Sequence, residues 1–341
     1  MANQYALGYT YHDVIDSEQD GMSAYTAIWG LDFNMSFIDV LARLSIHLLA
    51  DCHDAFVPLT RSLLNTETIP NMAVILLLDW NVPWTWARQM QKMIVFLQRI
   101  IDLMAADGDA VLMKNARFRG RDGLDNSRFS LDNEVDNTVS AHVSATGDYD
   151  EALGLPLCVV CQYAERMLTL EREQNWRDTQ FDFVQQYLRT ITLKYGGSLI
   201  YTASSAKNQL PSMINLLLGI ESVSQRDLVK PSVVDRDKIV VPCNWDSWTK
   251  ILILDDGFPT ASISETWSKD MHAATSAPTS VDSISTSHPS SEAAIIYETR
   301  IEDPYAHRSG GDKVQPPEAL EVEGQSMQEF LKEQLGKADT R

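Results

Sequence analysis

Residues 72–104 read MAVILLLDWNVPWTWARQMQKMIVFLQRIIDLM, which is an apolar run followed by a tryptophan-rich turn and a long amphipathic segment. The run 72–79 is unbroken and ends in Asp79, which predicts a strand buried on both faces of a parallel sheet. Beyond the turn, apolar residues recur at helical spacing. They predict one apolar helix face formed by Trp86, Met90, Met93, Ile94, Leu97, Ile101 and Met104. The stretch therefore predicts a strand–turn–helix unit.

Strands and helices are predicted to alternate along most of the chain. Strand patterns lie at 5–10, 40–50, 155–160 and 198–202, and helix patterns at 53–64, 181–195 and 210–218. Gly196-Gly197 is expected to end the helix at 181–195. Residues 233–254 hold two β-branched runs around Asn244-Trp245-Asp246, and we expect a short extension packed on the domain. The alternation predicts an α/β fold with a parallel sheet.

The composition of the chain narrows the class of protein. Its 341 residues carry a formal net charge of −19, which argues against nucleic acid and anionic membrane surfaces as partners, because phosphates would be repelled. No apolar run approaches the roughly 18 residues that span a bilayer, and the N-terminus does not resemble a secretory signal. Four cysteines do not make a disulfide framework in a chain of this length. We therefore expect a cytosolic protein with no direct membrane insertion.

Two polar segments are expected to be disordered. Residues 115–150 are rich in Gly, Asp and Asn and show no periodicity, which predicts a disordered insertion. Residues 259–325 are acidic and rich in Ser, Thr and Pro, which predicts a flexible linker with one apolar island at residues 294–297.

The last predicted element is a short amphipathic helix at 326–336. Ser326 and Glu329 form a capping-box pattern, and Gly336 stands where a C-terminal cap is needed. The apolar face of this helix consists of Met327, Phe330, Leu331 and Leu335. Because about ten residues are too few for a stable isolated helix, it should fold only against a partner or its own domain. We favour helix-in-groove binding to a partner.

Several segments resemble the dynein light intermediate chain family, in the form found in fungi. In family order they are LGYTYHDV (7–14), LLLDWNVPWTW (76–86), LGLPLCVVCQ (153–162), FDFVQQYLRT (181–190), SLIYT (198–202) and DRDKIVVPCNWDSW (235–248). The resemblance covers residues 4–258 in pieces. The folded core of this family is similar to a Ras-like G domain, so the resemblance implies a G-like domain over residues 1–258.

The resemblance also implies a function. Members of the family are non-catalytic accessory subunits of cytoplasmic dynein, and no cofactor is expected. The G-like domain would bind the tail of the dynein heavy chain. The C-terminal region, with the helix at 326–336, would contact cargo adaptor proteins. The chain would then act in microtubule-based transport as part of a cytoplasmic, microtubule-associated motor complex.

The chain departs from a Ras-like G domain at its start. The phosphate-binding motif GxxxxGK[ST] is absent, and the chain begins at what resembles the second strand of that fold. The missing first strand would lie between the strands at 40–50 and 72–79, and its loss would leave two rows of unpaired backbone groups. We therefore expect a gene model that begins too late. We also interpret residues 21–38 as a translated intron, with a genuine loop insertion as the alternative.

The alternative function is that of a small GTPase-like nucleotide-binding protein whose phosphate loop is missing from this gene model. Such a protein needs a base-reading Asn/Lys-x-Asp, but residues 161–165 at that position read CQYAE. Ser205, Ala206 and Lys207 resemble a guanine-contacting loop, although such a tripeptide is common by chance. Asp79 stands at the position of a metal-side aspartate, where we expect a turn or capping role.

The tryptophans are the remaining candidates for binding. Trp80, Trp84 and Trp86 surround one proline turn, and Trp245 and Trp248 flank another. Because Trp is a favoured interface anchor, we expect one of these clusters to contact the heavy chain, with core packing as the alternative. Cys158 and Cys161 do not predict a metal site, because residues three apart in a strand point to opposite faces.

Overall fold

The computed structural model describes residues 7–15, 40–64, 68–106, 150–151, 153–204, 209–220, 229–243, 245–276 and 291–306. Residues 6–303 form one compact unit. The second unit, residues 1–5 and 304–341, contains only Pro304–Ala306 among the described residues. The predicted insert at 21–38 and helix at 326–336 lie outside the described residues, as does the insertion at 115–150 apart from Asp150.

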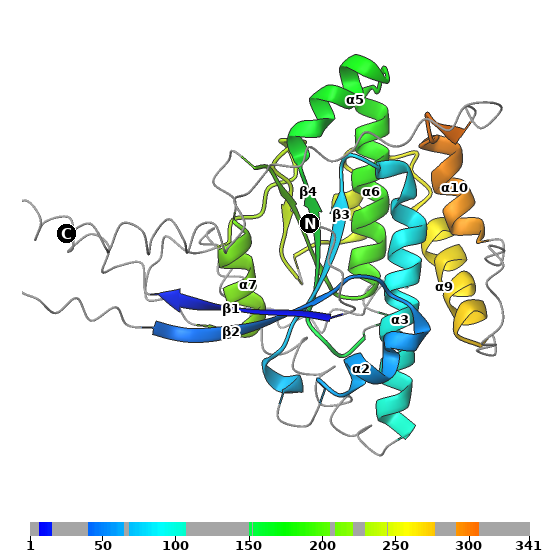
Figure 1. Ribbon diagram of the computed structural model, residues 1–341. Coiled ribbons are helices and arrows are strands. Elements are labelled where there is room, and N and C mark those ends of the chain that lie inside the picture. The colour runs from blue at the N-terminus through cyan, green and yellow to red at the C-terminus, as the bar shows by residue number, and fades with distance from the viewer. Residues whose placement is uncertain are drawn as a thin grey trace, which may run out of the picture. The chain divides into compact units, whose positions relative to one another are not determined.

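A four-stranded, mostly parallel sheet forms the centre of the compact unit 6–303 (Figure 1). Its order is β3 (Val74–Asp79), β4 (Leu157–Gln162), β5 (Ser198–Thr202) and β6 (Val240–Val241). β3, β4 and β5 are parallel, whereas β6 runs antiparallel to β5. The predicted α/β class is therefore confirmed, with a mixed sheet in place of a purely parallel one.

Helices cover both faces of this sheet. α3 (Trp86–Ala106) and α6 (Asp178–Lys194) pack on one face, and α7 (Leu210–Leu218) packs on the other. Because side chains alternate along a strand, Val159 and Cys161 of β4 join the larger core while Cys158 and Val160 join the smaller one beneath α7. A short η5–α5 segment, Ala164–Arg166 and Met167–Glu173, follows β4.

The end of α6 shows how local sequence sets a boundary. Gly196 has φ = +66°, a left-handed conformation that glycine adopts without strain. The next residue, Gly197, donates its N–H to the carbonyl of Thr192 at 2.9 Å. A Cβ atom at Gly197 would lie 3.2 Å from the carbonyl oxygen of Leu157, a tight contact that glycine avoids as the chain approaches β4. The predicted helix end at Gly196-Gly197 is confirmed.

β1 (Leu7–Ile15) and β2 (Val40–Leu49) pair with each other as a separate antiparallel two-stranded sheet. Among the described residues no strand pairs with the outer edge of β3. Leu76 and Leu78 of β3 are buried, but Ile75 and Leu77 are 39% and 49% exposed. The prediction that this strand is buried on both faces is therefore wrong, because β3 is an edge strand and α7 packs over β4, β5 and β6.

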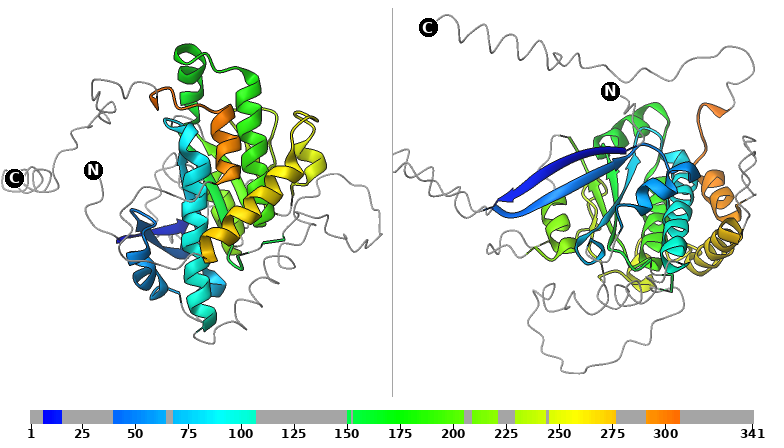
Figure 2. Two further views of the ribbon diagram at one scale, coloured as in Figure 1. Left: turned by 90° about the vertical axis from the view of Figure 1, so that its right-hand side faces the viewer. Right: turned by 60° about the horizontal axis from the view of Figure 1, so that its bottom comes forward.

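The predicted disordered linker at 259–325 is also wrong over two of its parts. α9 (Thr260–Ser276) and α10 (Glu292–Arg300) lie beside α3 and α6 (Figure 2). Ile263, Trp267 and Met271 of α9 are buried at four-residue spacing, and Tyr297 of α10 is fully buried. The many Ser and Thr residues lower the average hydrophobicity of the segment and mask this apolar stripe, which is what packing requires.

Shorter elements complete the unit. The helix predicted at 53–64 is a 3₁₀ turn, η1 (Asp54–Phe56), followed by α2 (Val57–Arg61). Another turn, η2 (Ile69–Asn71), leads into β3. The expected extension at 233–254 includes β6 and α8 (Trp248–Ile251), and Trp245 and Leu252 pack against the core. No described helix combines the length and apolar character needed to cross a membrane, although α3 has 21 residues.

Candidate functional site

The first tryptophan cluster forms where β3 ends. Asp79 Oδ1 accepts hydrogen bonds from the backbone N–H and side-chain amide of Asn81, both at 2.7 Å, and so fixes the turn. Trp86, the first residue of α3, donates its indole N–H to the Asp79 carbonyl at 3.0 Å. The expected turn role of Asp79 is therefore confirmed. A 3₁₀ turn, η3 (Pro83–Thr85), connects the two elements.

The side chains of this cluster point into the core. Trp80 and Trp86 are completely buried, with ring centroids 4.6 Å apart in an edge-to-face arrangement, and Trp84 is only 7% exposed. Trp80 also contacts the rings of Trp176, Phe181 and Tyr201. Aromatic packing of this kind stabilises a core. Core packing, the alternative expected for Trp80, Trp84 and Trp86, therefore describes their rings in the folded domain.

The second cluster consists of Trp245, which precedes α8, and Trp248, the first residue of that helix. Both side chains are half-buried. The ammonium of Lys250 lies 4.0 Å from the centroid of the Trp245 ring and donates to the Trp245 carbonyl at 2.5 Å. Ser247 caps α8 by accepting the N–H of Lys250. Unlike the first cluster, this one is only partly enclosed, with Trp245 packed against the core and the indole nitrogen of Trp248 buried.

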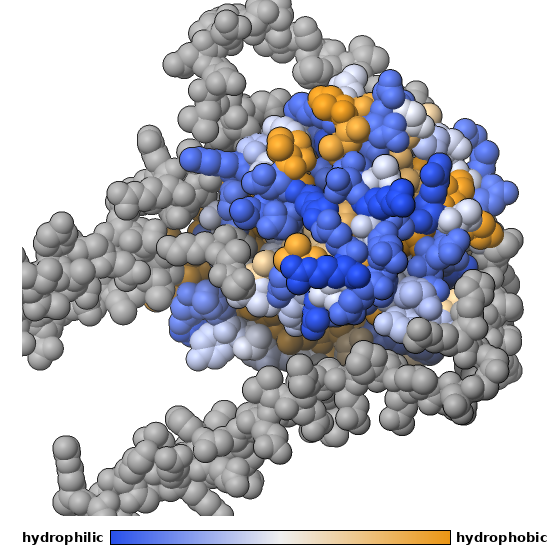
Figure 3. All heavy atoms as spheres, turned by 90° about the horizontal axis from the view of Figure 1, so that it is seen from above, coloured by the Kyte–Doolittle hydropathy of each residue, from blue (hydrophilic) through white to orange (hydrophobic). Residues whose placement is uncertain are grey.

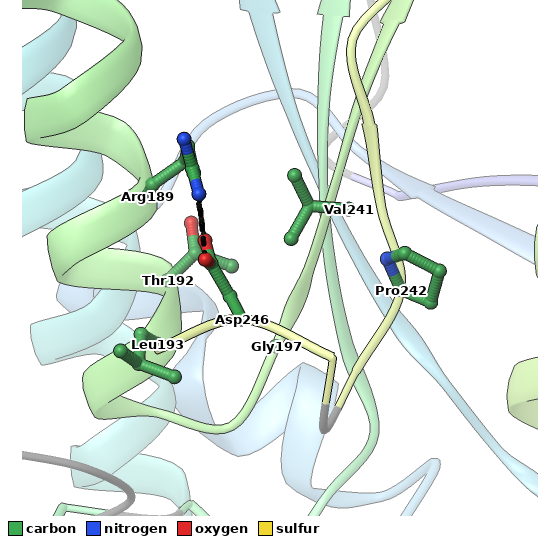
Figure 4. Close-up of a pocket in the computed structure, with 7 residues that line it drawn as sticks. All are labelled: Arg189, Thr192, Leu193, Gly197, Val241, Pro242 and Asp246. Atoms are coloured by element: carbon green, nitrogen blue, oxygen red, sulfur yellow. Dashed lines mark hydrogen bonds and ion pairs between the residues drawn. The ribbon is translucent and has the colours of Figure 1, made fainter. Parts of the chain in front are cut away.

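A buried ion pair holds this loop to α6. The guanidinium of Arg189 donates from Nε and Nη2 to the two carboxylate oxygens of Asp246, both at 2.7 Å, and the two side chains are 0% and 4% exposed (Figure 4). Bidentate contacts of this kind fix orientation as well as distance. Arg189 and Asp246 both lie in segments that resemble the family, yet their pairing across 57 residues could not be inferred from sequence.

A small pocket lies beside this ion pair. Seven residues line it: Arg189, Thr192, Leu193, Gly197, Val241, Pro242 and Asp246 (Figure 4). The Nη1 of Arg189 and the hydroxyl of Thr192 are buried there without a protein partner. The cavity volume is about 10 Å³, roughly the room that one water molecule needs. The pocket is therefore too small for a nucleotide or a metabolite.

The carboxyl ends of β3, β4 and β5 are where an open α/β sheet would bind a ligand. Here Ser204 donates its hydroxyl at 2.8 Å and its backbone N–H at 3.3 Å to the carboxylate of Glu165. Tyr163, which precedes the 3₁₀ turn η5 that contains Glu165, has φ = +62°. The weak candidates Ser205, Ala206 and Lys207 lie outside the described residues. Viewed from this end, the described surface is mostly hydrophilic with separate hydrophobic patches (Figure 3).

The cysteines are buried as separate core residues. Cys158 and Cys161 lie on opposite faces of β4, as the strand periodicity predicts. Burial raises the pKa of the Cys158 thiol to about 12 and that of Cys243 to about 11. Within the described ranges, no group of three or more His, Cys, Asp or Glu residues is arranged to hold a metal ion.

These features define an α/β domain with a mostly parallel sheet, in which described residues at the strand ends hydrogen-bond to one another. The chain belongs to the dynein light intermediate chain family, whose model matches residues 6–283. By its name, this family comprises the light intermediate chains of dynein. The match extends beyond residue 258, into the part of the chain that contains α9.

Individual relatives agree with this assignment. The chain is 25% identical over 271 residues to cytoplasmic dynein 1 light intermediate chain 1 of Rattus norvegicus, covering 76% of this chain and 48% of the relative. It is 36% identical to the Dictyostelium discoideum protein of the same name over 105 residues, or 30% and 20% of the two chains. The chain spans at most about half the length of these curated relatives.

A solved structure shows the same fold. The crystal structure of the conserved domain of a dynein light intermediate chain superposes with a TM-score of 0.69 and is 37% identical in sequence. The match covers 89% of this chain and 91% of that one.

Proposed function

We propose that this chain binds the tail of the dynein heavy chain through its α/β domain and links the motor to cargo adaptor proteins. We also propose that it is the fungal form of its family. The observation that carries the proposal is membership of the dynein light intermediate chain family over residues 6–283. The protein would act in the cytoplasm, on microtubules.

Trp245 and Trp248 are the heavy-chain contacts that we propose. They are the two tryptophan candidates with accessible surface, and the Arg189–Asp246 pair holds their loop in one orientation. An ordered anchor loses little conformational entropy on binding, which favours affinity. For the adaptor contact we propose Met327, Phe330, Leu331 and Leu335, on the strength of their amphipathic pattern alone.

Co-expression with a dynein heavy-chain tail fragment tests the proposal. We expect the full chain to co-elute with the fragment at a defined mass in size-exclusion chromatography with light scattering. The W245A/W248A double variant should bind at least tenfold more weakly. Co-elution of neither the full chain nor any variant, with the chain folded and monomeric, would overturn the proposed function.

The adaptor contact needs a separate measurement. Replacement of Phe330, Leu331 and Leu335 by Ala should abolish binding of a purified cargo-adaptor fragment and leave heavy-chain binding unchanged. If the adaptor fragment binds the triple variant as tightly as the original chain, the helix at 326–336 is not the adaptor contact.

A further inference from the structure

Two loops beside α6 carry the most exposed large hydrophobic side chains in the described part of the chain. Val234 is 91% exposed and Ile253 is 80% exposed, whereas every other such side chain in that part is at most 63% exposed. Val234 lies in the turn that precedes β6, and Ile253 follows α8. Side chains of this type presented to solvent on ordered loops are candidates for protein contacts.

Both loops are fixed by consecutive glutamines of α6. Gln185 donates from Nε2 to the carbonyl of Val233 at 3.2 Å. Gln186 donates from Nε2 to the carbonyls of Ile251 at 2.9 Å and Asp255 at 3.0 Å. Both glutamine side chains are buried. Both loops are therefore held to the same turn of α6, and Val234 and Ile253 lie on backbone that is fixed before any partner binds.

A partner cannot bind these loops by adding a strand to the sheet. The outer edge of β6 is already paired, because Ser232 and Val240 exchange both backbone hydrogen bonds, at 2.9 and 2.7 Å. Strand addition at β6 is therefore excluded, and the exposed side chains of the two loops are available for contact with an amphipathic helix.

The charged residues around the two loops indicate which charge a partner should carry. Asp182 of α6 lies near the carboxylates of Asp178 and Asp255, and its pKa is raised by partial burial and by these two neighbours. Arg236 opposes this effect, but it is already paired with Asp178 at 2.8 Å and with Glu171 at 2.6 Å. Negative charge is thus in excess at Asp182, and a cationic side chain of a partner would be attracted there.

We propose that Val234, Ile253 and Asp182 form a docking surface for a basic amphipathic helix of the dynein heavy-chain tail. Aliphatic side chains of that helix contact Val234 and Ile253, and a lysine or arginine lies beside Asp182. This inference rests on the proposed function and adds to it the place of the contact and the chemistry of the partner. Trp245 and Trp248, the tryptophans of the proposed heavy-chain contact, precede Ile253 in sequence, and Trp248 begins α8.

The test compares matched variants in binding to the purified heavy-chain tail fragment. In V234S/I253S the dissociation constant should rise about tenfold or more. The control L168S removes a side chain on α5 that is 52% exposed and should leave the constant unchanged. D182K should also weaken binding, and raising the salt concentration should weaken the original chain more than D182K.

The outcomes separate this inference from the proposed function. If the original chain binds and V234S/I253S binds within twofold of it, the docking surface is refuted while the heavy-chain assignment stands. If D182K binds more tightly than the original chain, the partner is not basic and the inference is also overturned. If the original folded chain does not bind, the proposed function fails and the inference falls with it. Circular dichroism and thermal melting of each variant exclude unfolding as the cause.

Discussion

The hydroxyl of Tyr297 donates a 2.8 Å hydrogen bond to the backbone carbonyl of Pro83, although 214 residues separate them in sequence. This bond joins α10 to the turn that starts α3. Close by, the guanidinium of Arg88 pairs with the carboxylate of Glu298, with one N···O distance of 2.7 Å. The ring of Tyr297 also contacts Tyr187 of α6, at a centroid distance of 4.7 Å. α10 is thus part of the core that encloses the first tryptophan cluster.

Replacement of Tyr297 by Phe tests the worth of this hydrogen bond. The free energy of unfolding should fall by about 1 kcal/mol, because the buried carbonyl of Pro83 loses its donor. Tyr297→Ala should cost about 3–5 kcal/mol, since it also leaves a cavity between α3 and α6. Urea denaturation measures both effects. The control Y163F, at a tyrosine that is 43% exposed, should be neutral; an equal loss in Y163F and Y297F would contradict the prediction.

Truncation tests whether α9 and α10 belong to the folded unit. A chain that ends at Ala306 should melt cooperatively and close to the temperature of the full chain. A chain that ends at Phe258 should fail to fold or should aggregate, because it exposes the faces of α3 and α6 that Ile263, Trp267 and Tyr297 cover. Calorimetry or circular dichroism distinguishes these results. Cooperative melting of the shorter chain at the same temperature would show that α9 and α10 add nothing to stability.

The buried pair Arg189–Asp246 is expected to behave asymmetrically on mutation. Asp246→Ala should lower the free energy of unfolding by about 3–5 kcal/mol, because it leaves the guanidinium of Arg189 buried without a counter-charge. The double variant R189M/D246L should lose much less, since neither charge remains. Glu265→Ala, which breaks an exposed pair with Lys269, serves as a control and should cause no measurable change. A double variant less stable than D246A would contradict the argument.

The rate at which each cysteine is labelled should decrease as its burial increases. Cys52 is half-buried, and its pKa is raised by burial and by the neighbouring carboxylate of Asp51. Cys158, Cys161 and Cys243 are buried, and burial raises the pKa of all three. At pH 8 iodoacetamide should therefore modify Cys52 first, with the other three reacting only after addition of denaturant. Peptide mass spectrometry identifies the modified residues. Rapid native labelling of Cys158 would show that the smaller core opens.

Asp182 should make stability depend on pH. Because its pKa is raised in the folded state by burial, Asp178 and Asp255, the ionised carboxylate disfavours folding at neutral pH. Asp182→Asn should therefore be slightly more stable than the original chain at pH 7. That advantage should shrink as the pH falls through the raised pKa toward about 3.9, the ordinary value for Asp. Thermal melts of both chains from pH 7 to pH 4 test this. An advantage that grows on acidification would reverse the sign and refute it.

Several strands and helices of the domain were predictable from the local sequence pattern. The predicted strand at 198–202 and helix at 210–218 match β5 and α7 residue for residue, and the predicted end of α6 at Gly196-Gly197 is correct. Such patterns depend on neighbours a few residues apart, so the sequence carries them directly. The family could likewise be identified from short segments such as LLLDWNVPWTW.

The errors arose where burial depends on distant parts of the chain. Trp80 and Trp245 both flank a turn that follows an apolar run, and their local sequences do not distinguish the enclosed ring from the partly accessible one. Trp80 is enclosed because Trp176, Phe181 and Tyr201 converge on it from other elements. The segment that contains α9 is similarly polar on average, and only its contacts with α3 and α6 show that its apolar stripe is part of the core.

The sequence by itself thus determined the alternating strands and helices, the α/β class and the family, because these depend on periodicity and on short motifs. Only the tertiary structure decided which tryptophans remain partly accessible and which charged side chains form ion pairs. Arg189 pairs with Asp246 across 57 positions, and the loops that carry Val234 and Ile253 are likewise held to α6 from distant parts of the sequence. Burial and electrostatic interaction act between neighbours in space, and chain folding alone makes these residues neighbours.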